Sequence, residues 1–263
     1  MKDDFYLTWI GLMKNINIDI LIKLISNLSY DLKVLYEISK EEEKFRKYII
    51  KNKISIFKQT YDEIIDGNLK EKSKKFYLFI KKQNIEVIST FSSQSYFDYS
   101  SHKNFIPVLF IFGNKKIFNL KKYFIYSEKN SSEILEIEEK LKAQANRKGY
   151  ALVETKDGKN VDIVVTTLDQ TFNITNANNK KKLYIFSNIE AWQIISYIFD
   201  TLVIINSKYK LRIVNVVENS LNLNKEIKVI PNSILDKNSY FSNYLIYQGA
   251  DILYRIDEMW KNC

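Results

Sequence analysis

The sequence has few of the residues from which proteins build disulfides and metal sites. Its 263 residues include six glycines, two prolines, one cysteine and one histidine. Cys263, the only cysteine, has no partner for an intrachain disulfide or a thiolate metal site, so we expect a reducing compartment and no metal. His102, the only histidine, stands between Ser101 and Lys103, which favours an ordinary surface position over a zinc ligand.

The scarcity of glycine excludes the common nucleotide-binding loops. No two glycines are closer than nine residues apart, so the chain has neither a G-x-G-x-x-G nor a G-x-x-x-x-G-K-[ST] motif. A G-x-S-x-G nucleophile elbow is also absent. Dehydrogenases, P-loop NTPases and serine hydrolases are therefore excluded in their usual forms, and no cofactor is expected.

Long hydrophobic runs are absent too. The most apolar window, residues 194–205, contains Ser196 and Asp200 and is shorter than the roughly 18 residues of a membrane-spanning helix. Asp3 and Asp4 stand where a secretory signal would carry lysines. We expect a cytoplasmic protein with no membrane partner.

Positive charge is abundant, but it is almost all lysine. Forty Lys and Arg residues against 31 Asp and Glu give a formal net charge of +9. Only Arg46, Arg147, Arg212 and Arg255 carry the planar guanidinium that binds phosphate with two parallel hydrogen bonds. This balance permits a nucleic-acid partner and is equally compatible with a solvated lysine-rich surface.

Hydrophobic spacing divides the chain into two parts. Residues 5–82 have apolar positions every three and four residues, which predicts short helices, one of them starting at Ser39 before Glu41–Glu43. After Gln83, short β-type runs alternate with helical windows at 132–148 and 213–223, which predicts βαβ units and a parallel sheet covered on both faces. The runs are 85–89, 108–112, 123–126, 151–154, 183–186, 202–205 and 227–230. Residues 171–182 are the expected mobile loop.

Acids and aromatic residues give weaker signals. The acidic clusters at Glu41–Glu43 and around Glu133–Glu139 are expected to form exposed ion pairs on helices. Asp157 and Asp162 follow a strand, where α/β proteins place functional residues. Several aromatic residues in expected loops or at element ends could stack on single-stranded bases or pack at the core edge: Tyr96, Phe97, Tyr99, Tyr123, Tyr126, Tyr240, Phe241 and Tyr244. Trp192 and Trp260 are expected on helical core faces.

Two segments resemble the DNA-processing protein A family (DprA, also called Smf). Residues 107–114, P-V-L-F-I-F-G-N, resemble the family's P-x-L-F-x-x-G-N strand, and residues 225–231, K-E-I-K-V-I-P, resemble its R-E-V-x-A-V-P strand. Pro107 and Pro231, the only prolines, both fall on family proline positions. From Pro231 the register continues through Ser233-Ile234, Ser239, Asn243, Leu245-Ile246 and Gly249-Ala250.

The resemblance covers nearly the whole chain and implies a fold. It implies an α/β class with a Rossmann-like, mostly parallel sheet over residues 83–263 and a helical SAM-like domain over residues 1–82. In a departure from the family, no C-terminal winged helix is expected. It also implies that the protein is not an enzyme. Relatives bind single-stranded DNA and hand it to the recombinase RecA during transformation, so the implied partners are single-stranded DNA, a RecA-type recombinase and a second copy of the chain.

The family's anion pocket is altered in this sequence. Its G-S-R segment is Tyr126-Ser127-Glu128 here, its R-R-N-R run falls on residues 190–193, its E-A on residues 206–207, and its S-G-S on residues 211–213. A carboxylate thus replaces the arginine that pairs with phosphate. The nucleic-acid-binding residues implied instead are Ser127, Lys129, Ser131, Lys180, Lys181, Lys182, Lys237, Ser239 and Asn243.

Three hypotheses remain open from the sequence. The first is a non-enzymatic single-stranded-DNA-binding protein that uses lysines and aromatic side chains. The second is a diverged homologue that acts through protein contacts, favoured by apolar Trp192, Leu211 and Ile213 in the altered pocket. The third is an enzyme on a Rossmann-like scaffold with Asp157 and Asp162 as its acids.

Overall fold

The computed structural model describes residues 4–16, 18–89, 108–128, 131–168 and 181–257. The expected mobile loop lies outside this part of the chain except for its last two residues, as do Tyr96, Phe97, Tyr99, His102, Trp260 and Cys263. The chain forms two compact units. One contains residues 1–112, 167–178 and 185–190, and the other contains residues 113–166, 179–184 and 191–263.

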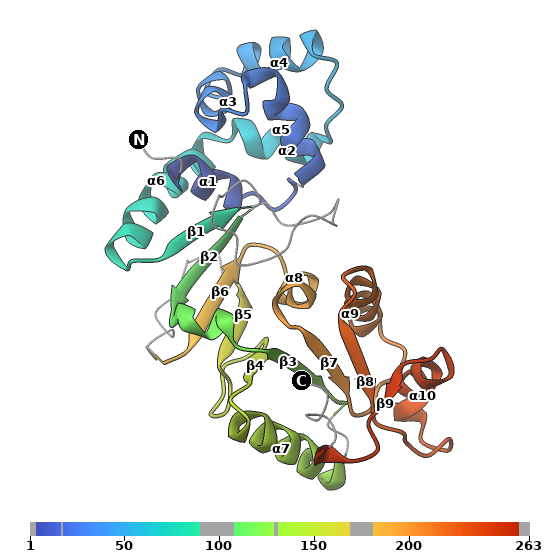
Figure 1. The fold of residues 1–263 in the computed structure, drawn as a ribbon. Coiled ribbons are helices and arrows are strands. Elements are labelled where there is room, and N and C mark those ends of the chain that lie inside the picture. The colour runs from blue at the N-terminus through green and yellow to red at the C-terminus, as the bar shows by residue number, and fades with distance from the viewer. Residues whose placement is uncertain (1–3, 17, 90–107, 129–130, 169–180, 258–263) are drawn as a thin grey trace. The chain divides into compact units, whose positions relative to one another are not determined.

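The first unit is built mainly from helices, as the spacing of apolar residues predicts (Figure 1). Asp31 begins one of them by accepting hydrogen bonds from the backbone N–H groups of Lys33 and Val34. Ser39 does not start a helix as expected; it ends that same helix, and the next begins after Glu41. The helices are α1 (Asp4–Gly11), α2 (Ile18–Ile25), η1 (Ser26–Leu28), α3 (Leu32–Ile38), α4 (Glu42–Lys51), α5 (Lys58–Ile65) and α6 (Gly67–Lys82).

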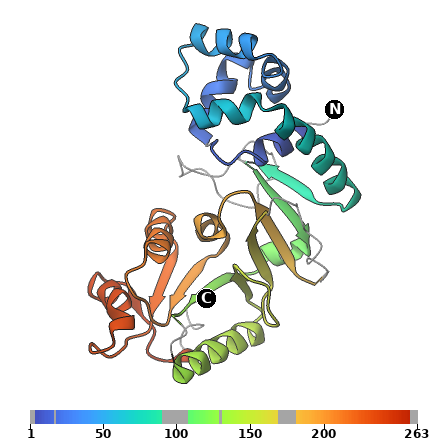
Figure 2. The ribbon, with the colours of Figure 1, turned by 180° about the vertical axis from the view of Figure 1, so that it is seen from behind.

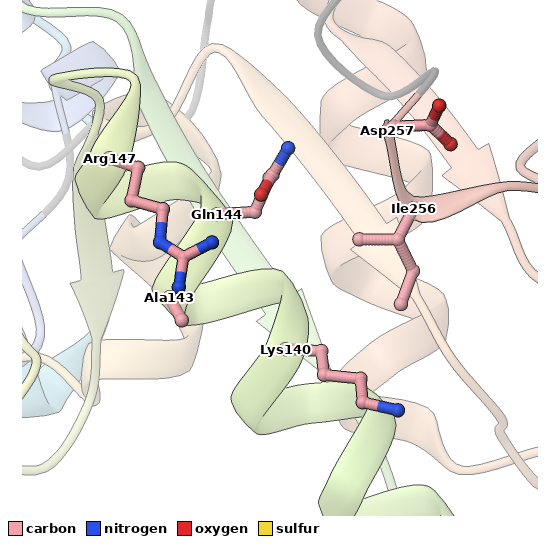
Figure 3. Close-up of a pocket in the computed structure, with 6 residues that line it drawn as sticks. All are labelled: Lys140, Ala143, Gln144, Arg147, Ile256 and Asp257. Carbon is pink, nitrogen blue, oxygen red and sulfur yellow. The ribbon is translucent and has the colours of Figure 1, made fainter.

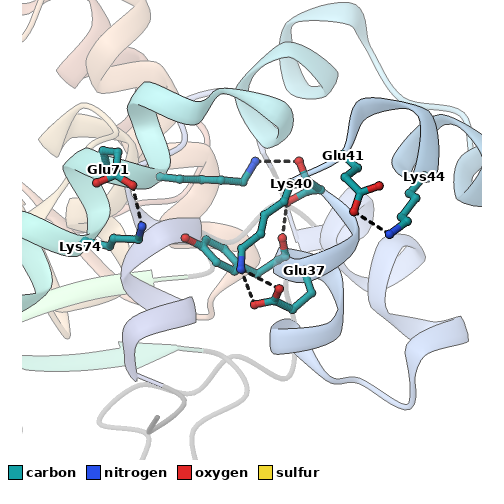
Figure 4. Close-up of polar contacts among 9 residues, drawn as sticks. Glu37, Lys40, Glu41, Lys44, Glu71 and Lys74 are labelled. Atoms are coloured by element: carbon teal, nitrogen blue, oxygen red, sulfur yellow. Dashed lines mark hydrogen bonds and ion pairs between the residues drawn. The ribbon is translucent and has the colours of Figure 1, made fainter.

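Lysines in this unit occupy two different environments. Lys40, Lys44 and Lys74 form exposed ion pairs with glutamates three residues earlier in the chain, as Figure 4 shows. Such pairs contribute little to stability. Lys70 of α6 is instead buried, where its ammonium donates to the carbonyl oxygens of Ser39 and Ile64 at 2.9 and 2.7 Å. Burial lowers the pKa of Lys70 to about 8.

The strands form one sheet, and the order of the described strands is β1-β2-β6-β5-β4-β3-β7-β8-β9. The seven predicted strands are present, and the structure adds β5 and β9, which the sequence patterns did not identify. The strands are β1 (Glu86–Ser89), β2 (Val108–Gly113), β3 (Lys122–Tyr126), β4 (Ala151–Glu154), β5 (Ile163–Thr167), β6 (Leu183–Ser187), β7 (Thr201–Ile204), β8 (Glu226–Val229) and β9 (Asp251–Ile252). The mostly parallel α/β, Rossmann-like class is confirmed.

Gly113 marks the close approach of two strands in this sheet. A Cβ at Gly113 would lie 2.1 Å from the Lys182 carbonyl oxygen, and its φ of +105° lies in the region that favours glycine. The neighbouring Asn114 N–H donates to that same carbonyl at 2.8 Å. Gly113 belongs to the sequence pattern that resembles the DprA family. The close approach of the Lys182 carbonyl explains why a glycine is needed at this position.

In the second unit, helices cover both faces of the parallel strands (Figures 1 and 2). On one face, Tyr123 and Ile125 of β3 pack in a core cluster with Leu141 of α7. On the other, Phe124 contacts Trp192 of α8 with ring centroids 5.7 Å apart. The helices of this unit, α7 and α8 among them, are η2 (Lys115–Asn119), α7 (Ser132–Arg147), α8 (Ala191–Ile198), α9 (Leu211–Asn222), η3 (Lys237–Ser239) and α10 (Tyr240–Tyr247).

Three further expectations concern the aromatic residues near the end of the chain, membrane-spanning helices and the domain boundary. Tyr240, Phe241 and Tyr244, expected in loops or at element ends, belong to helix α10. Among the described residues, no helix is long and apolar enough to cross a membrane. The domain boundary after Lys82 stays a prediction, because contact-defined units need not coincide with segments that fold separately.

Candidate nucleic-acid interface

The sheet reverses its strand order between β3 and β7. These two strands are parallel neighbours, but the chain leaves β3 through α7 to reach β4 on one side and leaves β7 through α9 to reach β8 on the other. In open α/β sheets, ligands bind outside the carboxyl ends of the strands at this switch point. Ser127 and Glu128 follow β3, and residues 205–210 follow β7, so these segments flank the switch point.

Glu128 places a negative charge at this position. Its side chain is only 8% exposed, and its carboxylate accepts a hydrogen bond from the Tyr126 hydroxyl at 2.9 Å and a short one from the Lys210 ammonium. Its backbone N–H donates to Asn206 Oδ1 at 2.8 Å, which ties the ends of β3 and β7 together. Burial, together with the bond to Glu128, raises the pKa of the Tyr126 hydroxyl, which therefore stays a donor at neutral pH.

Ser127 is attached to a second buried acid. Its hydroxyl donates to Glu138 Oε2 of α7 at 2.5 Å, and Glu138 Oε1 accepts from Lys142 at 2.7 Å. Lys142 also lies 3.0 Å from Glu154 at the end of β4. Glu138 was expected on an exposed face, but it is buried and anchors α7 to the carboxyl ends of two strands.

The predicted lysine cluster at residues 180–182 is only partly described. Lys180 lies outside the described residues, as does Lys129. Lys181 is exposed. The Lys182 ammonium is 2.5 Å from both Asp157 Oδ1 and the Gly158 carbonyl oxygen, so it holds the loop after β4.

The two candidate catalytic acids, Asp157 and Asp162, have separate structural roles. Partial burial would raise the pKa of Asp157, but hydrogen bonds from Lys182 and Tyr184 lower it. Burial raises the pKa of Asp162, which accepts from the Leu152 backbone N–H at 2.9 Å. Each carboxylate is thus engaged by hydrogen bonds that hold the fold.

The other predicted binding residues also make local contacts. Ser131 caps α7 by accepting from the Ile134 N–H at 3.2 Å. Ser239 is buried and donates to Asp236 at 2.8 Å, and Asn243 exchanges hydrogen bonds with the backbone of Asn232. Lys237 is exposed. Of this group, Lys237 is the residue whose position suits a ligand contact.

The loop between β7 and α9 contains candidates that sequence reasoning missed. Lys208, Tyr209 and Lys210 occupy it, with Arg212 at the start of α9, and the segment 206–212 has no acidic residue. Tyr209 is 70% exposed. The sequence signal for this loop was Lys-Tyr-Lys directly after an apolar strand. Such a short segment has no hydrophobic periodicity, so the sequence alone does not distinguish it from an ordinary polar loop.

One pocket of the described residues lies beside α7, away from the switch point. A pocket of about 330 Å³ is lined by Lys140, Ala143, Gln144, Arg147, Ile256 and Asp257 (Figure 3). Its Lys140 is paired with Glu136 at 2.6 Å and its Asp257 with Arg255 at 3.0 Å. Within the described ranges, no group of three or more His, Cys, Asp or Glu side chains could hold a metal ion.

Solved structures with the same fold come from DNA-processing proteins. DNA processing protein A (DprA) from Streptococcus pneumoniae matches with a TM-score of 0.55 and 14% sequence identity, over 88% of this chain and 96% of that one. DprA from Helicobacter pylori, whose structure concerns its single-stranded DNA binding mode, matches with a TM-score of 0.52 and 14% identity. That match covers 66% of this chain and 93% of the other. No family model and no curated protein matches the sequence.

Proposed function

We propose that this protein binds single-stranded DNA in the manner of a DNA-processing protein. The observation that carries the proposal is the loop 206–212, which brings three cations and an exposed tyrosine to the switch point of a DprA-like fold. In the matched H. pylori protein the bound ligand is single-stranded DNA. Lys208 and Lys237 are the exposed cations to which we assign phosphate contacts.

The chemistry of these residues sets the character of the binding. Lysines neutralise phosphates as point charges, and aromatic rings stack on any base, so binding should depend strongly on salt and little on sequence. The protein would act without a cofactor and without chemistry on the DNA. Delivery of the strand to a RecA-type recombinase in recombination and transformation, in the cytoplasm, is the process to which we assign it.

The test is fluorescence anisotropy with a labelled oligo-dT strand and a matched duplex at low and moderate salt. We expect salt-sensitive binding that favours the single strand. The variant Lys208→Glu/Lys237→Glu should weaken binding at least tenfold, whereas the matched reversal Lys44→Glu/Lys74→Glu in the helical unit should weaken it far less. Binding to neither DNA at low salt would refute the proposal.

Glu128 favours a second candidate function. The buried carboxylate of Glu128 repels phosphate and is already paired with Lys210. If the chain has lost DNA binding for this reason, it would act through protein contacts, as a homodimer or a partner module. Sedimentation velocity distinguishes this function, which predicts concentration-dependent self-association or a stable complex in the absence of any DNA binding.

A further inference from the structure

Helix α10 exposes a row of tyrosines. Tyr240, Tyr244 and Tyr247 are spaced by four and three residues, so they lie along one face of the helix. Tyr240 is 56% and Tyr247 84% exposed, and Tyr244 is exposed as well. The opposite face anchors the helix, because Phe241 and Leu245 are buried. Contiguous exposed rings mark interaction surfaces, whereas rings exposed singly are ordinary.

The loop at the switch point continues this row. Tyr209 contacts Phe241 with ring centroids 4.8 Å apart and Tyr244 with centroids 6.5 Å apart. The backbone N–H of Phe241 donates to the Ser207 carbonyl oxygen at 3.0 Å, which fixes the start of α10 to the same loop. The four tyrosines, Tyr209, Tyr240, Tyr244 and Tyr247, therefore form one surface, which we call the tyrosine row.

Two exposed lysines stand next to the tyrosine row in the sequence. Lys208 precedes Tyr209 and Lys237 lies in η3, directly before α10; both are exposed. The loop that carries Lys208 is tied to the start of α10 by the hydrogen bond from the Phe241 N–H to the Ser207 carbonyl oxygen, and Lys237 lies three residues before Tyr240 in the chain. Helix α10 itself carries no acidic residue.

We propose that the tyrosine row is a base-stacking surface for single-stranded nucleic acid, with Lys208 and Lys237 contacting its phosphates. This proposal rests on the proposed function and adds where the bases bind. Every base has a π-face, so several rings beside two lysines suit a flexible strand whose bases are unpaired. A duplex hides those faces within its own stack, so the row also provides a physical basis for preferring the single strand.

A protein partner is the competing occupant. Ile234 and Leu235, which precede η3, are also exposed, and tyrosines are common at protein interfaces. The cations beside the rings and the position next to the switch-point loop favour nucleic acid. The experiment must therefore measure the contribution of the bases to DNA affinity and the self-association of the protein separately.

The test compares oligo-dT with an abasic strand of the same length, which has the phosphates but no bases. We expect the wild-type chain to bind oligo-dT about tenfold or more tightly than the abasic strand. Tyr240→Ala/Tyr247→Ala should lose most of this difference and leave affinity for the abasic strand unchanged. Tyr240→Phe/Tyr247→Phe should keep it, because the rings remain. Phe57→Ala, which removes an exposed ring before α5, is the control and should bind as wild type does.

The outcomes separate the two proposals. Failure of the wild-type chain to bind either strand refutes the proposed function and this inference with it. Wild-type binding that the alanine variant matches on both strands refutes the inference alone. A variant that keeps its DNA affinity but loses self-association in sedimentation velocity shows that the row is a protein interface, which also overturns the inference. Thermal unfolding of each variant checks that it is folded.

Discussion

A single residue, Glu128, sets the charge at the switch point. The carboxylate is nearly buried, yet its partner Lys210 is about half exposed, so the pair can exchange with ligands from solvent. A phosphate that approaches Lys210 must compete with a carboxylate that is already in place. Glu128 therefore weakens anion binding at the very position where the fold offers a site.

Glu128→Gln should strengthen binding of single-stranded DNA. Glutamine keeps the size of the side chain and an acceptor for Tyr126, but it removes the charge that occupies Lys210. We expect a threefold to tenfold higher affinity for oligo-dT at low salt and a salt dependence steeper by about 0.7 in log–log slope, corresponding to about one more neutralised phosphate. The matched control is Glu71→Gln in α6, which frees the exposed Lys74. Unchanged affinity in Glu128→Gln would show that Lys210 does not contact DNA.

Lys70 provides a residue-scale prediction about stability. Its pKa is about 8 in the folded chain and 10.5 in the absence of burial, so between these values the unfolded state binds more protons. The contribution of Lys70 to the free energy of unfolding therefore rises with pH across that interval, by up to about 3 kcal/mol. This contribution is smallest below pH 8. Urea unfolding of the wild type and of Lys70→Met from pH 7 to pH 10 measures it. The stability of the wild type relative to the variant should increase with pH, and a constant difference would contradict the assignment.

At the scale of elements, α7 is attached to the sheet by its buried ions. Glu138 links Ser127 after β3 to Lys142, which reaches Glu154 at the end of β4. Burial alone would lower the pKa of Lys142, but the two glutamates raise it, so the lysine stays charged and needs both of them. Removing Glu138 leaves a buried cation with one partner in place of two.

Glu138→Ala should therefore destabilise the chain by about 3–5 kcal/mol, the usual loss when one member of a buried ion pair is removed. Glu136→Ala, on the same helix, breaks the exposed pair with Lys140 and should cost less than about 1 kcal/mol. Urea unfolding followed by circular dichroism compares the two variants. Similar losses in both would mean that the buried network contributes nothing beyond helix formation.

Elements with a clear local hydrophobic pattern were predictable, and those defined by tertiary contacts were not. Residues 108–112 form a continuous apolar run and residues 132–148 have apolar positions at helical spacing, and the strand and the helix are both present. Strand β5 is a short run whose last residue, Thr167, is exposed, and α10 is an aromatic helix whose exposed rings resemble a loop in sequence. Strand β5 lies between β4 and β6, and the start of α10 is hydrogen-bonded to Ser207, and a local pattern contains neither kind of contact.

The candidate site was less predictable for the same reason. The resemblance identified Tyr126 and Glu128 as the altered positions of the G-S-R segment, and the structure places this segment at the end of β3, beside the switch point. It did not indicate Lys210, which lies 82 residues from Glu128 along the chain. Several residues assigned to DNA, Ser131 and Ser239 among them, cap helices or fill local hydrogen bonds. These local roles were not visible in the sequence, and the assignment of both residues to DNA stays a prediction.

For the whole molecule, the main question is whether the helical segment and the sheet segment fold separately. Contacts within the first unit argue against it. Gly11 at the end of α1 lies so close to β2 that an added Cβ would be 2.8 Å from Val108, and the Phe76 ring of α6 is 5.2 Å from the Phe110 ring. Helices before Lys82 therefore cover apolar side chains of strands after it.

A fragment of residues 83–263 should accordingly expose Val108 and Phe110, both buried in the intact chain. We expect it to bind the dye ANS and to self-associate, and to unfold at lower urea concentration than the full chain, because that apolar surface loses its cover. Gly11→Ala in the full chain tests the same contact more gently and should cost about 1–3 kcal/mol through overpacking. A monodisperse fragment with the urea midpoint of the full chain would instead establish the boundary after Lys82 as one between independently folding domains, with the contacts across it contributing no stability.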